Sequence, residues 1–105
     1  MAVLLCLSLT AAAEIVTISR AYEVRLSDFR APATPSGSVT FRPCFSCEAK
    51  TVRVAPNTRY VVNGRNVDLK EFRKSLSQVS KRAGETVIVK HHLESDIVIL
   101  VSVTL

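Results

Sequence analysis

The feature that most constrains the fold is an Asn-Gly dipeptide followed closely by the start of a helix. Asn63-Gly64 separates two short apolar runs, and this dipeptide readily adopts the two positive φ angles of a type I′ turn. Asp68, four residues later, is placed to cap the backbone amide of Glu71. A tight hairpin that leads directly into a helix predicts an α+β fold, with a small antiparallel sheet and one helix.

The predicted helix covers about residues 68–83 and is amphipathic. Its apolar residues recur at spacings of three and four, which places them on one face: Leu69, Phe72, Leu76, Val79 and Ala83. Gly84 follows them and is expected to cap the C-terminal end.

Alternating apolar residues predict strands on both sides of this unit. Residues 15–27 favour one or two strands, and shorter strands are expected around residues 39–42 and 51–54. Ala55-Pro56-Asn57 is expected to turn the chain. After the helix, residues 86–90 and 97–105 predict a C-terminal β-hairpin. Its last strand is apolar on one face and partly apolar on the other, which favours a central position in the sheet or a partner that covers it.

The N-terminal residues 1–13 are typical of a secretory signal peptide. An uncharged apolar run ends in Ala11-Ala12-Ala13, so cleavage after Ala13 would leave Glu14 as the mature N-terminus. The run has no preceding Lys or Arg and is short for a signal, and a true start codon upstream of Met1 would account for both. The alternative is a buried N-terminal strand or helix. A transmembrane span is not expected, because it needs about 20 apolar residues.

These patterns divide the chain into four parts. The signal peptide, residues 1–13, precedes an N-terminal strand region, residues 14–29. Residues 30–38 contain two prolines and a glycine among small residues and predict a flexible linker. Residues 39–105 are expected to form the compact α+β core, which is small enough that its hydrophobic core alone would give modest stability.

The chain carries 14 Lys and Arg against 9 Asp and Glu, for a net charge of +5. In an exported protein, this balance points to an anionic envelope component or an envelope protein as partner rather than nucleic acid. The candidate surface lies on and beside the helix: Arg65, Lys70, Arg73, Lys74, Lys81 and Arg82. It lacks the interleaved aromatic residues that single-stranded nucleic acid would stack on. The alternative is an ordinary solvated helix face.

Cys44-Phe45-Ser46-Cys47 is the most chemically specific motif, and it allows three interpretations. A redox pair would need a lowered thiolate pKa, but Pro43 and Glu48 supply neither a cation nor a helix terminus. A metal site would need two more ligands, and His91 and His92 are adjacent on an expected strand, where they face opposite sides. A structural disulfide remains, and it is the one we favour because removal of Cys6 with the signal leaves an even number of cysteines.

Enzymatic activity is not expected. The sequence has no nucleophile elbow, phosphate-binding loop, zinc-protease motif or dinucleotide fingerprint, and it implies no cofactor and no metal.

The stretches Arg42 to Cys47, Asn57 to Arg65 and Val67 to Phe72 resemble small exported bacterial proteins of unknown function. Those proteins combine a C-x-x-C pair with an Asn-Gly hairpin, a short helix and a C-terminal hairpin. The resemblance covers about residues 41–105. It implies a bacterial periplasmic location and transfers no catalytic or binding residue.

Taken together, the sequence predicts an exported, non-enzymatic binding or accessory module of the envelope. The alternative is a thiol-disulfide or metal-handling protein that uses Cys44 and Cys47.

Overall fold

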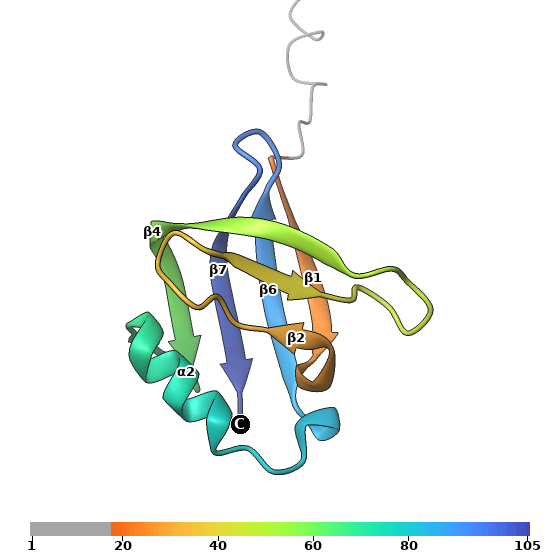
Figure 1. Cartoon of the computed structure of the whole chain (residues 1–105), viewed down its shortest axis with the longest axis vertical. Helices are drawn as coiled ribbons and strands as arrows, with labels where there is room; N and C mark the ends of the chain where they lie inside the picture. Colours follow the sequence, from red (N-terminus) through yellow and green to blue (C-terminus); the bar gives the residue numbers. More distant parts are fainter. Residues whose placement is uncertain (1–17) are drawn as a thin grey trace, which may run out of the picture.

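The computed structural model describes residues 18–105, which form strands, one α-helix and two short 3₁₀ helices (Figure 1). The predicted signal peptide and the predicted mature start at Glu14 lie outside the described residues. In chain order the elements are β1 (Ser19–Arg25), η2 (Leu26–Asp28), β2 (Phe29–Arg30), β3 (Ser38–Phe41), β4 (Lys50–Val62), β5 (Arg65–Val67), α2 (Leu69–Ser77), η3 (Arg82–Gly84), β6 (Thr86–His92) and β7 (Ile97–Thr104).

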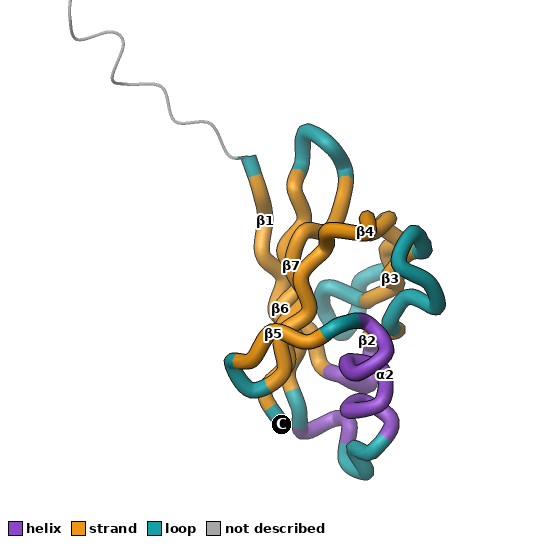
Figure 2. The backbone as a smooth tube through the Cα atoms, turned by 90° about the vertical axis from the view of Figure 1, so that its left-hand side faces the viewer, coloured by secondary structure: helices purple, strands orange, loops and turns teal. Residues whose placement is uncertain are grey.

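All of these strands belong to one mixed sheet, in the order β1-β6-β7-β4-β3-β2, with β5 paired to β4. β4 and β7 run parallel, whereas the other neighbouring pairs are antiparallel. The expectation of a small antiparallel sheet is therefore wrong, because the sheet is mixed and curls into a half-barrel (Figure 2). Parallel neighbours need a long crossover, which residues 63–96 provide with α2 and β6.

The predicted C-terminal β-hairpin is present. β6 pairs antiparallel with β7, from Thr86 opposite Thr104 to His92 opposite Ile97. β7 lies between β6 and β4, which explains why both of its faces carry apolar residues.

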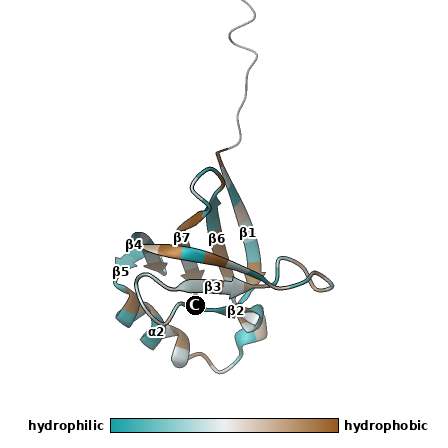
Figure 3. Ribbon diagram, turned by 45° about the horizontal axis from the view of Figure 1, so that its top comes forward, coloured by the Kyte–Doolittle hydropathy of each residue, from teal (hydrophilic) through white to brown (hydrophobic). Residues whose placement is uncertain are grey.

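β4 is longer than predicted, because the chain bends sharply around Ala55-Pro56-Asn57 but the strand continues instead of ending there (Figure 1). One strand runs through these residues, and its register with β7 shifts between Val54 and Arg59. The Thr58 hydroxyl accepts a hydrogen bond from the Ala55 N–H at 2.9 Å and donates one to the Val98 carbonyl at 2.6 Å. These bonds satisfy backbone groups where the irregular register interrupts the ladder. Hydrophobic and hydrophilic bands alternate along β4 in Figure 3.

Helix α2 begins where the sequence predicts and ends earlier. The Asp68 side chain accepts a hydrogen bond from the Glu71 N–H at 2.8 Å, as expected for the N-cap. The helix stops at Ser77 rather than near residue 83, and a separate 3₁₀ turn, η3, covers Arg82–Gly84. The Arg82 side chain donates to the Leu76 carbonyl at 3.0 Å, and the Val79 N–H donates to the same carbonyl at 3.2 Å, so Arg82 adds a second donor at the end of the helix.

The hydrophobic core packs the sheet against α2 and the segment around β2. α2 buries Phe72 and Leu76, and the Phe72 ring lies 5.1 Å from the Tyr60 ring and 6.5 Å from the Phe29 ring, centroid to centroid. This contact between Phe29 and Phe72 places the chain after β2 beside the helix, where the candidate site lies.

Candidate functional site

Residues 29–35 and helix α2 form the two walls of a groove. Pro32 is fully buried, and the Arg73 guanidinium donates a hydrogen bond to the Ala33 carbonyl at 3.2 Å. Residues 30–38, which were predicted as a linker, thus include one strand residue at each end and one side chain in the protein interior. The division of the chain into a linker and a core stays a prediction.

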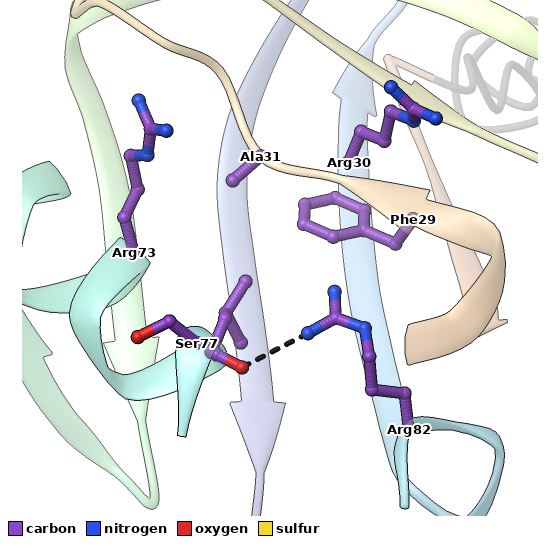
Figure 4. Close-up of a pocket in the computed structure, with 7 residues that line it drawn as sticks. Phe29, Arg30, Ala31, Arg73, Ser77 and Arg82 are labelled. Atoms are coloured by element: carbon purple, nitrogen blue, oxygen red, sulfur yellow. Dashed lines mark hydrogen bonds between the residues drawn. The ribbon is translucent and has the colours of Figure 1, made fainter. Parts of the chain in front are cut away.

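The first of two clefts in this groove has a volume of about 350 Å³. Three arginines, three apolar residues and one serine line it: Arg30, Arg73 and Arg82, then Phe29, Ala31 and Leu76, and Ser77. Figure 4 shows the Arg82 guanidinium close to the Phe29 ring, with Arg30 and Arg73 on opposite sides of Ala31. The three positive charges are therefore spread along the cleft rather than gathered at one point.

The second cleft adjoins the first at Arg73, whose side chain lines both. It also measures about 350 Å³ and is lined by Ala33, Pro35, Leu69, Lys70 and Arg73. We refer to the two clefts together as the cationic groove. Its four charged residues are Arg30, Lys70, Arg73 and Arg82.

Among residues 18–105, no acidic side chain lines either cleft. Within residues 18–105, the only Lys or Arg in an ion pair is Arg25, whose guanidinium lies 3.0 Å from Asp28. Arg73 and Arg82 each use one guanidinium N–H on a backbone carbonyl, at 3.2 Å and 3.0 Å respectively. A guanidinium has five N–H donors, so most of their donor capacity stays available to a ligand.

Only half of the predicted basic residues line the cationic groove. Lys70, Arg73 and Arg82 reach the cationic groove, whereas Arg65, Lys74 and Lys81 do not line it. Arg65 lies on β5, Lys74 on α2, and Lys81 just before η3. Arg30 was not among the predicted basic residues. It lines the groove because β2 pairs with β3 and places the following residues beside the helix. No local motif marks Arg30, since the pairing depends on residues ten positions later.

Cys44 and Cys47 form a disulfide, with their Cα atoms 5.0 Å apart, in the loop between β3 and β4. The Cys47 N–H also donates a hydrogen bond to the Cys44 carbonyl at 3.2 Å, so the disulfide closes a tight turn. Neither cysteine lies at the start of a helix. The disulfide is consistent with an oxidising, extracytoplasmic compartment.

The two histidines lie near the β6–β7 turn, away from the cysteines in the fold. The His91 Nε2 atom is 2.7 Å from the Asp96 carboxylate, and the His92 Nδ1 atom is 2.7 Å from the Ser95 hydroxyl. In the described part of the chain, no three His, Cys, Asp or Glu side chains are grouped as metal ligands would be.

Among residues 18–105 there is no helix of the length and apolar character needed to cross a bilayer. A comparison of the sequence with protein-family models found no match, and comparisons with curated proteins and with solved structures found no significant similarity.

Proposed function

We propose that this domain is a non-enzymatic binding module whose cationic groove holds an extended anionic polymer of the bacterial envelope, such as an acidic or phosphorylated polysaccharide. The observation that supports this proposal is the lining of the groove, which contains Arg30, Lys70, Arg73 and Arg82 and no acidic side chain from the described part of the chain. An ordinary solvated surface intersperses both signs of charge.

The spacing of the charges favours a polymer over a small ion. Arg30 and Arg73 lie on opposite sides of Ala31 (Figure 4), an arrangement that suits a ligand with more than one anionic group. A chain with repeated anionic groups would contact them in turn and continue past Arg73 to Lys70 in the second cleft. Guanidinium groups suit this role, because their planar donors match carboxylate and phosphate oxygens in a bidentate manner.

Fluorescence polarisation with two labelled probes tests the proposal. Oligogalacturonate carries carboxylates and inorganic polyphosphate carries phosphates, so the pair also reports which anion is preferred. We expect saturable binding that weakens as salt is raised, because the contacts are electrostatic.

Three substitutions locate the binding site. Arg30→Gln removes a groove charge that makes no hydrogen bond within the described residues, and Arg73→Gln removes the charge shared by both clefts. Each should weaken binding by roughly fivefold, as expected for about 1 kcal/mol of charge-assisted hydrogen bonding. Lys74→Gln is the matched control on the same helix, outside both clefts, and should change affinity by less than about twofold. An equal effect of all three would indicate non-specific attraction and would reject the groove.

A further inference from the structure

Strand β1 forms one edge of the sheet, and half of its backbone groups face away from the protein. Its neighbour in the sheet is β6. The Leu93 N–H donates to the Ile18 carbonyl, and the Leu26 N–H donates to the Glu85 carbonyl, both at 2.9 Å. Even-numbered residues of this segment therefore bond toward β6. Because backbone direction alternates along an antiparallel strand, the outward-facing groups belong to Ser19, Ala21, Glu23 and Arg25.

Among residues 18–105, no strand pairs with this edge of β1. Ala21, Glu23 and Arg25 are exposed, and no backbone hydrogen bond from residues 18–105 reaches their outward-facing groups. Free edges of this kind are templates for strand pairing. The seven residues of β1 contain no proline, so every outward N–H can act as a donor.

The sequence of β1 is compatible with pairing to a second copy of itself. When a two-fold axis passes through Tyr22, all of β1 is paired, with Ser19 opposite Arg25 and Ala21 opposite Glu23. Both members of these pairs are odd-numbered, so their outward N–H and C=O groups face each other. No like charges lie directly opposite in this register. An axis through Glu23 would shorten the overlap and place two glutamates opposite each other, which is unfavourable.

The same register brings exposed apolar side chains together. Among residues 18–105, four large hydrophobic residues are exposed: Ile18 (59%), Phe45 (79%), Leu93 (36%) and Leu105 (41%). The backbones of Ile18 and Leu93 are hydrogen-bonded to each other beside the start of β1. Phe45 lies at the other end, where the Arg25 guanidinium is 5.4 Å from its ring centroid. In antiparallel pairing, the start of one β1 lies beside the end of the other, so Ile18 and Leu93 of one copy approach Phe45 of the second.

We propose that the protein forms a two-fold dimer through antiparallel pairing of β1 with β1, closed at each end by Phe45 against Ile18 and Leu93 of the other copy. The Cys44–Cys47 disulfide holds the Phe45 loop in shape before association, which lowers the entropic cost of the contact. This inference does not depend on the cationic groove, because β1 and Phe45 do not line it.

Sedimentation velocity of the full chain over a wide concentration range tests the dimer. We expect the mass to rise from that of one 11.5 kDa chain to twice that value as the concentration increases. Amide hydrogen exchange supplies a second measurement on the unaltered protein. The Ala21 and Glu23 amides should exchange rapidly in the dilute monomer and become protected on dimerisation, whereas the Tyr22 and Val24 amides should be protected at all concentrations. A monomer at every concentration would overturn the proposal.

Two substitutions locate the interface. Ala21→Pro removes an N–H that faces the second copy and leaves the ladder to β6 intact, so self-association should weaken at least tenfold. Phe45→Ser should weaken it as well, while Leu105→Ser, an equivalent change at an exposed residue outside the contact, should leave it unchanged. If Ala21→Pro prevents folding, amide hydrogen exchange at Ala21 and Glu23 of the unaltered protein locates the interface instead. Dimers that form without protection of these two amides would place the interface elsewhere and contradict the proposal.

Discussion

The Arg73 guanidinium donates a hydrogen bond to the Ala33 carbonyl, 3.2 Å away and 40 residues distant in the sequence. This bond ties helix α2 to the segment that follows β2, which are the two walls of the cationic groove. Arg73 therefore helps to set the width of the groove and, with its remaining N–H groups, offers donors to a ligand.

Arg82 has a similar double role, and it leads to a prediction on stability. Arg82→Ala removes the hydrogen bond to the Leu76 carbonyl at the end of α2, and should lower the free energy of unfolding by about 1 kcal/mol. Urea denaturation followed by circular dichroism measures this change. Lys81→Ala is the neighbouring control and should stay within about 0.5 kcal/mol of the parent protein. Equal stability of the two variants would show that Arg82 does not cap the helix.

Asp68→Ala should reduce the free energy of unfolding by about 0.5 to 2 kcal/mol, because the Glu71 N–H loses its acceptor at 2.8 Å. Asp68→Asn retains a side-chain oxygen at the same position and should lose much less. Chemical denaturation of the two variants compares them directly. An unchanged denaturation midpoint for Asp68→Ala would mean that this hydrogen bond contributes nothing to stability.

Local patterns predicted the features that depend on a few adjacent residues. Asn63 and Gly64 have φ values of 51° and 83° and join β4 to β5, with Val62 opposite Arg65. Asp68 caps the helix, and Cys44 pairs with Cys47. In each case the partners are at most four residues apart, so a short stretch of sequence contains both partners of the interaction.

Features that depend on distant partners could not be predicted from local patterns. β4 continues through Pro56 because the Thr58 hydroxyl reaches Val98, 40 residues away. The parallel pairing of β4 with β7 has no local signature either, and it changes the sheet from antiparallel to mixed. Arg30 joined the groove for the same reason, since its position depends on strand pairing and on the packing of Phe29 against Phe72.

Replacement of both Cys44 and Cys47 with Ser should lower stability only modestly and leave the fold and ligand binding in place. The disulfide closes a loop of sequence separation 3, so its effect on the entropy of the unfolded chain is small. Thermal denaturation and polarisation assays of the Ser pair measure both properties. Turnover of a disulfide substrate by the parent protein, or loss of function in a natively folded Ser pair, would support the thiol-disulfide alternative instead.

Tyr60 makes the stability of the folded protein depend on pH in the alkaline range. Burial disfavours its phenolate form and raises the pKa of Tyr60 to about 12, from an ordinary value of 10.0. The folded state therefore binds this proton more tightly than the unfolded state does. Its contribution to stability is fully present below pH 10, and is lost as the pH rises from 10 toward 12.

Tyr60→Phe isolates this effect, because other groups also titrate at high pH. The difference in unfolding free energy between the parent and the variant should shift in favour of the variant between pH 10 and 12. Near pH 7 the variant should be at least as stable as the parent, since the buried Tyr60 hydroxyl has no hydrogen-bond partner among the described residues. A clear loss of stability at pH 7 would mean that this hydroxyl is hydrogen-bonded in solution.

The most direct test of ligand binding in the cationic groove is a map of amide chemical shifts during titration of the isotope-labelled protein with oligogalacturonate and, separately, with polyphosphate. Binding in the cationic groove predicts saturable shift changes concentrated in residues 29–35, in helix α2 and around Arg82. Changes centred on basic residues outside the groove, such as Arg53, Arg59 and Arg65 on β4 and β5, would contradict it. So would small, unsaturated changes spread over every basic residue of the surface.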